Sequence, residues 1–243
     1  MVFKAYGKTD KGRVRENNQD YFTVKNLSDE VILAVVCDGM GGERGGNIAS
    51  RNAVNIISQN ICSNYRDIYD ENGIRNMMMS AVSVANALVH DMAVKDENLR
   101  GMGTTVIVCV LKNGMAHILH AGDSRVYIGD EKGVTRLTRD HSVVQMLIET
   151  GELTEEEAAI HPKKHYITRA LGVEPELDAE YGEYLLKDGN RLLLCTDGLT
   201  NHLSADEIAK ELMQNPPEDI PQRLIDTANK KGGSDNITAV VLL

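Results

Sequence analysis

The chain has 243 residues, of which 42% are apolar and 26% are charged, and its formal net charge is -10 at pH 7. This composition is typical of a globular protein large enough to bury its own core, and it excludes disorder, collagen and coiled coil as descriptions of the whole chain. The excess of acidic side chains disfavours nucleic acid or an anionic membrane as the main partner, because both bind basic surfaces.

Short apolar runs rich in β-branched residues predict the strands of the fold. In chain order the clear runs are 31–36, 104–111, 116–121, 191–195 and 237–243, with weaker strands expected at 21–24 and 125–129. Between them, apolar residues recur every three or four positions, which predicts amphipathic helices. The expected helices are 48–61 with Asn47 as N-cap, 74–95, 205–214 and 218–231.

The order of these elements predicts an α+β fold, in which helix pairs pack on mainly antiparallel sheets. No repeat, linker or low-complexity segment divides the chain, so one domain over 1–243 is expected. The polar segment 141–170 fits either a lid or subdomain beside a working site or a solvated structural insert. The first residues lack the apolar core of a signal peptide, and we expect a cytoplasmic protein.

Five aspartates lie at the ends of predicted strands, where a sheet stops and loops gather. Asp38 and Asp197 each follow a strand within an Asp-Gly pair, and Asp123 follows another. Asp20 and Asp235 stand just before strands. A single Asp-Gly after a strand is usually a turn. Its repetition, together with three more acids at comparable places, favours a shared cleft.

Carboxylates that converge in a cleft need a counter-charge, because desolvation and mutual repulsion oppose their ionisation. Carboxylate, carbonyl and water ligands select Mg²⁺ or Mn²⁺, whereas zinc prefers the His and Cys spacings that this sequence lacks. Two such ions would activate a water and clamp a phosphoryl group. Arg15 is then a candidate to bind the phosphate through its planar guanidinium, with a solvated surface arginine as the alternative. The Gly-rich segment 38–46 lacks the spacing of a nucleotide-binding loop.

Eight motifs resemble, in order and spacing, those of the metal-dependent Ser/Thr protein phosphatases, the protein phosphatase 2C-like family in its compact bacterial form. From about residue 5 to the C-terminus they read VRENNQD, VCDGMGG, GTT, HAGDSR, LTRDHS, ITRALG, LLLCTDGL and GGSDNIT. The resemblance implies an αββα four-layer sandwich with two central antiparallel sheets, flanking helix pairs and a flap insert at about 141–170. It further implies hydrolysis of phosphoserine and phosphothreonine by direct attack of a metal-bridging water or hydroxide, with no phosphoenzyme.

The resemblance also assigns roles to the aspartates of the motifs. Asp38 would bridge two Mn²⁺ or Mg²⁺ ions, and the Gly39 carbonyl would bind one of them. Asp197 and Asp235 would complete the shell of the other ion, and Asp20 would hold metal-bound waters.

Two further roles follow from the same resemblance. Asp123 would help to bind a third ion, which it would share with Asp197, and Arg15 would bind the substrate phosphate. The expected partners are phosphorylated proteins, including a Ser/Thr kinase and its substrates, and a monomer is expected.

Two positions depart from the bacterial pattern. Glu43 stands where a histidine is usual, and Asn47 stands where a glutamate is usual. That histidine is a candidate general acid in relatives, and Glu43 could replace it only if the cleft raises its pKa. The alternative is that water donates the proton and Glu43 is a solvated loop residue. Asn47 is expected to act only as a helix cap.

Two other classes of function remain open at this point. One is a metal-dependent phosphatase or phosphodiesterase for small molecules, which the same carboxylates would serve. The other is a non-catalytic regulator that binds a phosphorylated partner through Arg15 and the flap. The retention of all five aspartates argues against the regulator, because binding alone would not require them.

Overall fold

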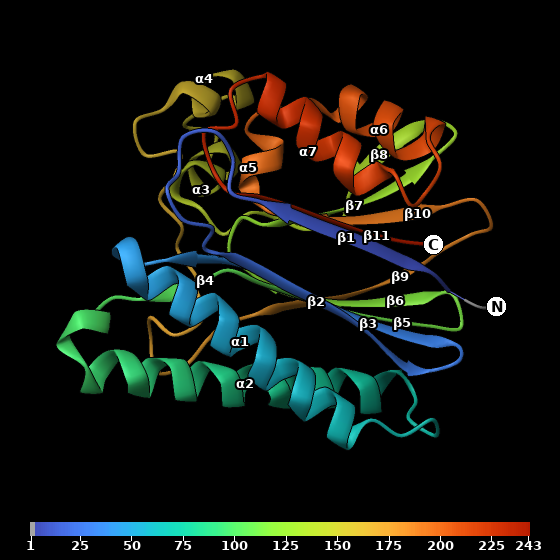
Figure 1. The fold of residues 1–243 in the computed structure, drawn as a ribbon, viewed down its shortest axis with the longest axis horizontal. Coiled ribbons are helices and arrows are strands. Elements are labelled where there is room, and N and C mark those ends of the chain that lie inside the picture. Colours follow the sequence, from blue (N-terminus) through green and yellow to red (C-terminus); the bar gives the residue numbers. More distant parts are fainter. Residues whose placement is uncertain (1–2) are drawn as a thin grey trace.

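Two antiparallel sheets lie face to face, and a layer of helices covers the outer face of each (Figure 1). The computed structural model describes residues 3–243, except for the side chains of residues 43 and 44. This arrangement confirms the expected α+β class and the four-layer αββα sandwich.

The first sheet is built from both ends of the chain and from its middle. Its strand order is β1 (Ala5–Asp10), β11 (Ile237–Leu242), β10 (Arg191–Cys195), β7 (Arg125–Asp130) and β8 (Gly133–Arg136). Its outer face is covered by α6 (Ala205–Gln214) and α7 (Ile220–Lys230). The short helix α5 (Asp197–Thr200) begins directly after β10, at the end of the sheet.

The second sheet forms mostly from consecutive segments. Its order is β2 (Asp20–Ser28), β3 (Val31–Met40), β5 (Val106–Lys112), β6 (Met115–Ala121) and β9 (Glu180–Leu185), and the short β4 (Gly103–Thr104) also pairs with β3. Its outer face is covered by α1 (Gly42–Asn64) and α2 (Glu71–Lys95), followed by the 3₁₀ helix Glu97–Leu99.

Alternate residues of the central strands serve two different cores. In β3, Ile32 and Val36 pack between the sheets, whereas Leu33 and Val35 pack against the helices. Because successive side chains point to opposite faces, a strand buried on both faces reads as one continuous apolar run.

The helix α2 is long and apolar enough, by length and composition alone, to cross a membrane. In this structure it packs beside α1 against the second sheet, and its buried residues include Ile74, Met78, Ala85 and Val89. Long core helices of globular domains meet the same two criteria.

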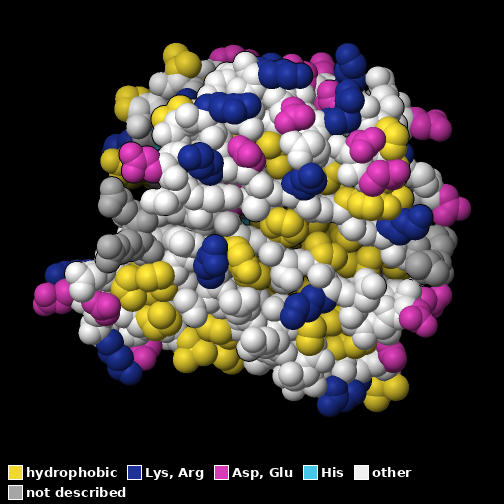
Figure 2. Space-filling view, viewed as in Figure 1, with side chains coloured by type: hydrophobic (Ala, Val, Ile, Leu, Met, Phe, Trp, Pro, Cys, Tyr) yellow, Lys and Arg dark blue, Asp and Glu magenta, His cyan; other side chains and the backbone are white. Residues whose placement is uncertain are grey.

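Lys and Arg side chains lie scattered among Asp and Glu on the face seen in Figure 2.

The expectation that Asn47 caps a helix is wrong. The helix α1 begins at Gly42, with Gly41 as N-cap at φ 115°, and Asn47 lies inside it, where its side-chain oxygen accepts a hydrogen bond from Arg51 at 2.7 Å. The glycines within 42–46 are typical of a loop in sequence, but here they lie in a helix and are required by packing. A Cβ on Gly46 would lie 2.7 Å from the backbone of Gly39, so this close approach outweighs the low helix propensity of glycine.

The polar segment 141–170 lies at the end of the sandwich, near α5 (Figure 1). It contains two short helices, α3 (Val143–Glu149) and α4 (Glu155–Ile160). Ser142 and Ile167 form an isolated β-bridge that closes its base. We refer to residues 141–170 as the flap.

Candidate active site

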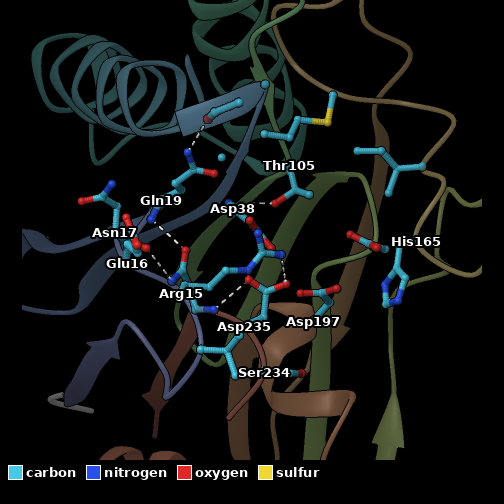
Figure 3. Close-up of a pocket in the computed structure, with 18 residues that line it drawn as sticks. Arg15, Glu16, Asn17, Gln19, Asp38, Thr105, His165, Asp197, Ser234 and Asp235 are labelled. Carbon is cyan, nitrogen blue, oxygen red and sulfur yellow. Dashed lines mark hydrogen bonds and ion pairs between the residues drawn. The ribbon is translucent and has the colours of Figure 1, made fainter. Parts of the chain in front are cut away.

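A cavity of about 740 Å³ opens at the end of the sandwich where the two sheets and the flap meet. The sequence-predicted residues that line it are Arg15, Asp38, Gly39, Asp123, Asp197 and Asp235 (Figure 3). Residues separated by more than two hundred positions are thus brought to one place.

Asp20 is the one predicted site residue that does not line the cavity. It is buried at the start of β2, where it lies opposite Asp38 in the register with β3. Its Oδ2 accepts hydrogen bonds from Thr196 Oγ1, directly after β10, at 2.8 Å and from Thr238 Oγ1, in β11, at 2.7 Å. Asp20 therefore joins the two sheets beneath the cavity, and its role in holding metal-bound waters stays a prediction.

The backbone around Asp38 is fixed by the GTT motif. The Asp38 N–H donates to Thr105 Oγ1 at 3.0 Å, and the Asp38 carbonyl accepts from the Thr105 N–H and the Thr104 hydroxyl, both at 2.8 Å. With its main chain held in this way, Asp38 presents its carboxylate to the cavity. The next residue must be glycine, because a Cβ on Gly39 would lie 2.1 Å from the Gly46 carbonyl oxygen.

The other three carboxylates reach the cavity from the ends of strands. Asp197 is the first residue of α5, and its Oδ2 accepts from Asn201 Nδ2 at 3.0 Å. Asp235 precedes β11, and its Oδ1 accepts from the Asn236 N–H at 2.8 Å. Asp123 stands in the turn between β6 and β7.

These carboxyl groups crowd one another in a partly desolvated space. Burial, followed by the charge of Asp20 and then the other nearby acids, raises the pKa of Asp38 well above its ordinary value. Burial also raises the pKa of Asp20 and of Asp123 to about 7, and it raises the pKa of Asp197. Ionisation of all these carboxyl groups together is therefore unfavourable unless further positive charge enters the site.

The geometry fits hard divalent cations. One oxygen of Asp197 and one of Asp20 are buried with no hydrogen-bond partner among the described residues. Unpaired buried carboxylate oxygens are costly, and metal coordination removes that cost. An all-oxygen donor set suits Mg²⁺ or Mn²⁺.

Arg15 lies at the rim of the cavity. Its Nη2 donates to Asp235 Oδ2 at 2.7 Å, while 54% of the side chain remains exposed. The hydrogen bond with Asp235 is the largest cause that raises the pKa of Arg15, and Asp38 and Asp197 add to it. The guanidinium is thus oriented toward the carboxylates with donors left for an incoming anion.

The flap contributes two residues that the sequence analysis did not single out. His165 and Ile167 line the cavity, and Figure 3 shows His165 on the opposite side of the Asp197 carboxylate from Arg15. The only sequence signal for His165 is its place in the polar segment expected beside the site. The side chain of Glu43, the candidate general acid, lies outside the described residues.

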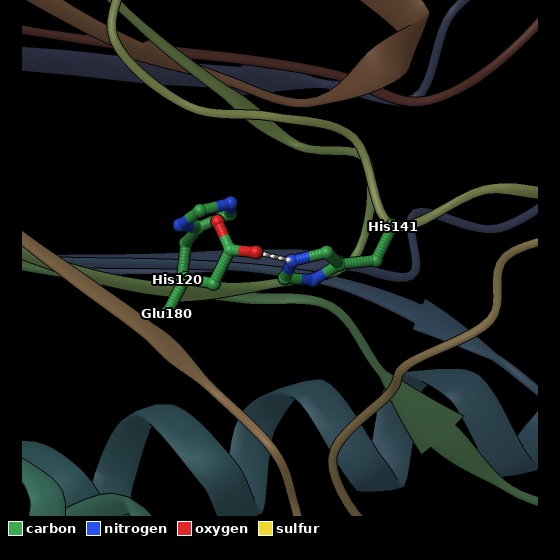
Figure 4. A group of neighbouring side chains, drawn as sticks. All are labelled: His120, His141 and Glu180. Carbon is green, nitrogen blue, oxygen red and sulfur yellow. Dashed lines mark ion pairs between the residues drawn. The ribbon is translucent and has the colours of Figure 1, made fainter. Parts of the chain in front are cut away.

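A second cluster of ligand-type side chains lies at the base of the flap, formed by His120, His141 and Glu180 (Figure 4). The two imidazoles stack with centroids 4.8 Å apart and planes only 11° from parallel, which prevents both rings from directing a lone pair at one ion. His141 Nδ1 accepts from the Gly122 N–H at 3.2 Å, and its Nε2 lies 3.2 Å from both Glu180 Oε1 and Arg169 Nη1. Arg169, at 3.6 Å from the same carboxylate oxygen, already supplies the positive charge.

Comparison with known proteins relates the whole chain to one family. The sequence model of the family described as protein phosphatase 2C matches residues 10–238. The protein phosphatase PhpP of Streptococcus pneumoniae is 37% identical over 235 residues, which are 96% of this chain and 94% of that protein.

Solved structures give the same relationship in three dimensions. The serine/threonine phosphatase of S. agalactiae superposes with a TM-score of 0.93 at 36% identity, over 99% of this chain and 98% of that one. The catalytic domain of the phosphatase PstP, solved in complex with two manganese ions, gives a TM-score of 0.85 at 30% identity, with 99% and 97% of the two chains covered.

Proposed function

The chain belongs to the protein phosphatase 2C family and is a Ser/Thr protein phosphatase, and we propose that it hydrolyses phosphoserine and phosphothreonine with two Mn²⁺ or Mg²⁺ ions held by its clustered aspartates. The observation that carries this proposal is the convergence of Asp38, Asp197 and Asp235, with Arg15 beside them, in one cavity. A third ion held by Asp123 and Asp197 belongs to the same proposal.

Each residue would have a distinct task. Asp38 and the Gly39 carbonyl would hold ions from the edge of one sheet, and Asp197 and Asp235 would hold them from the other. When bound, the divalent ions lower the pKa of a water and neutralise charge on the phosphoryl group. Asp20, buried behind Asp38, would accept hydrogen bonds from waters in the metal shell through its free oxygen.

Arg15 would bind and orient the phosphate. Its hydrogen bond to Asp235 holds the guanidinium at the rim, where its remaining donors match two phosphate oxygens. The phosphoryl group would then lie between Arg15 and the carboxylates, with its ester oxygen directed toward the opening. This placement needs no nucleophilic side chain of the protein.

The physiological setting is part of the proposal. The substrates would be phosphorylated proteins in the cytoplasm, among them a Ser/Thr kinase and its targets, and the enzyme would act as a monomer. The family membership and the match to PhpP support this choice over a small-molecule substrate.

The test is hydrolysis of a phosphothreonine peptide by the purified protein after treatment with EDTA. We expect no release of phosphate until Mn²⁺ or Mg²⁺ is added back, and slower hydrolysis of nucleotides and sugar phosphates at equal concentration. Activity that survives removal of the metals, or a preference for small phosphate esters, would contradict the proposal.

A further inference from the structure

Arg15 depends on the loop that carries it, residues 11–19, for its position. Among the described residues its guanidinium donates a hydrogen bond only to Asp235, and the proposed function gives that carboxylate a second task as a metal ligand. More than half of the Arg15 side chain is exposed, so packing contributes little to its placement. We refer to residues 11–19 as the Arg15 loop, three of whose residues, Arg15, Asn17 and Gln19, line the cavity (Figure 3). The main chain of this loop must be held against the acid cluster if the guanidinium is to meet a phosphate there.

The side chain of Asn236 fastens the Arg15 loop at both ends. Its Nδ2 donates to the Lys11 carbonyl at 3.0 Å and to the Asn17 carbonyl at 2.9 Å, and its Oδ1 accepts from the Gln19 N–H at 2.8 Å. These partners lie on either side of Arg15 in the sequence. Asn236 is only 4% exposed, and both of its N–H donors are used by the loop, so neither is left to bind a phosphate directly.

Backbone contacts hold the same loop against the segment that leads to Asp235. The Arg13 N–H donates to the Gly233 carbonyl at 2.7 Å. Gly12, at φ 78°, passes so close that a Cβ there would overlap the Asp235 carbonyl oxygen. These contacts do not depend on the side chain at position 236. A substitution of Asn236 therefore removes the side-chain fastening and leaves the backbone docking of the loop in place.

We propose that Asn236 is a positioning residue for substrate binding that acts through Arg15, an inference that rests on the proposed phosphatase function. Its side chain ties the loop of the phosphate-binding guanidinium to the residue directly after Asp235, a proposed metal ligand. The distance between the guanidinium and the metal site is thereby fixed. A phosphate that contacts both needs this distance to be constant, because a small misplacement of a binding group weakens its contact with the substrate.

The test is a double-mutant cycle on KM for a phosphothreonine peptide. Asn236→Ala removes the three loop contacts but keeps the backbone N–H that donates to Asp235 Oδ1 at 2.8 Å. We expect KM to rise about threefold to tenfold, with kcat and the Mn²⁺ affinity measured by calorimetry changed less than about twofold. In the Arg15→Ala background the same substitution should change KM by less than about twofold, because the group that Asn236 positions is gone.

Asn86→Ala is the matched control. Asn86 is 2% exposed and binds another loop in the same manner, since its Nδ2 donates to the Glu174 and Pro175 carbonyls, both at 3.0 Å, and its Oδ1 accepts from the Gly172 N–H at 2.7 Å. It lies outside the cavity. We expect a loss of stability in urea unfolding with an unchanged KM. If Asn236→Ala does not fold, Asn236→Ser, whose hydroxyl can donate to only one of the two carbonyls, takes its place with the same expectations.

Three outcomes would overturn the inference. The first is an equal rise in KM with and without Arg15, which would mean that Asn236 acts independently of the guanidinium. The second is an unchanged KM in the folded Asn236 variant. The third is a collapse of Mn²⁺ affinity in that variant, which would make Asn236 a support of the metal site. Each of these leaves a metal-dependent wild type and so leaves the proposed function intact. A wild type inactive on every phosphoprotein substrate would instead overturn the proposed function, and this inference with it.

Discussion

The Asp38 carboxyl group is placed where its own ionisation is unfavourable. Burial and four neighbouring aspartates raise its pKa, yet its main chain is held by three hydrogen bonds with Thr104 and Thr105. A group held so firmly in an unfavourable electrostatic environment costs stability in the metal-free protein. Sites of this kind are typical of functional centres, where structure is arranged for a ligand.

Asp38→Asn is expected to separate stability from function. Because burial and the neighbouring acids raise the pKa of Asp38, removal of this ionisable group should make the metal-free variant more stable than the metal-free wild type at pH 8. Added Mn²⁺ should no longer stabilise it, and turnover of a phosphopeptide should fall at least 100-fold. Urea unfolding with and without Mn²⁺ measures the first two effects, and Asp91→Asn on the exposed surface of α2 serves as control. Wild-type turnover in Asp38→Asn would contradict the assignment.

Arg15→Ala is expected to weaken substrate binding without loss of metal binding. Loss of a charged, two-pronged phosphate contact should raise KM for a phosphopeptide about tenfold or more, with a smaller change in kcat. Arg13→Ala, in the same loop but outside the cavity, is the control. If KM stays unchanged while Mn²⁺ affinity collapses, Arg15 supports the metal cluster instead.

The four aspartates that line the cavity were predictable because each stands at one end of an apolar run, whereas Asp20, predicted with them, is buried behind Asp38. His165 was not predictable in this way, since it lies in a polar segment whose chain path only the fold defines. The start of α1 was missed because glycine signals a loop in sequence, whereas here Gly46 packs against Gly39. A close approach between two backbones leaves no mark in sequence periodicity.

The strands that sequence patterns missed entirely share a position in the sheets. β1, β8 and β9 are edge strands with half-buried or exposed side chains, so they lack the continuous apolar runs that revealed β3, β5 and β11. An edge strand is stabilised by pairing with its neighbour as much as by its own composition. The helix α5 was missed because it has only four residues.

The base of the flap is fastened to the active-site turn through one residue. His141 donates its N–H to the Gly122 carbonyl at 2.9 Å and accepts the Gly122 N–H on its ring, while its own carbonyl accepts from the Thr168 N–H at 2.7 Å. Gly122 precedes Asp123, so the strand end that carries this acid and both ends of the flap share a hydrogen-bonded junction.

His141→Ala is therefore expected to loosen the flap. The buried Gly122 N–H would lose its acceptor, which costs about 1 to 3 kcal/mol in the free energy of unfolding. Amide hydrogen exchange over 142–168 should accelerate more than exchange in β3, as the junction opens locally. His90→Ala in α2 is the control. Equal exchange rates in the variant and the wild type would show that the flap is held by other contacts.

The contact between the two sheets is apolar at the centre of the sandwich and polar at the end that holds the acid cluster. The apolar layer between them holds the sandwich together, while Asp20, Thr196 and Thr238 join the sheets just behind the acid cluster. The acid cluster therefore lies where the two sheets meet. Repulsion among its ionised carboxylates opposes the contact between the sheets, which the apolar layer favours.

The stability of the metal-free protein should consequently fall as pH rises from about 4 to 8. Asp20 and Asp123 have folded-state pKa values of about 7, above the usual value for an unfolded aspartate, so the folded state binds more protons in this interval. The stability that these two groups contribute is complete below pH 4 and is lost as pH rises through 7. Thermal unfolding in EDTA across this range measures the effect, and a melting temperature that rises with pH through this interval would contradict it.

Divalent cations should reverse this trend, because they bind the ionised carboxylates. Saturating Mn²⁺ should raise the melting temperature more at pH 8 than at pH 5. Equal shifts at both pH values would indicate a metal site made of groups that do not titrate in this range.

The most direct test of the account is calorimetric titration of the metal-free protein with Mn²⁺ in two buffers of different ionisation enthalpy. Carboxyl groups with raised pKa values must release protons as metal binds, so we expect at least two bound ions, with proton release from Asp20 and Asp123 that is measurable at pH 6.5 and smaller at pH 9. The absence of binding at millimolar Mn²⁺, or binding without proton release at pH 6.5, would contradict it.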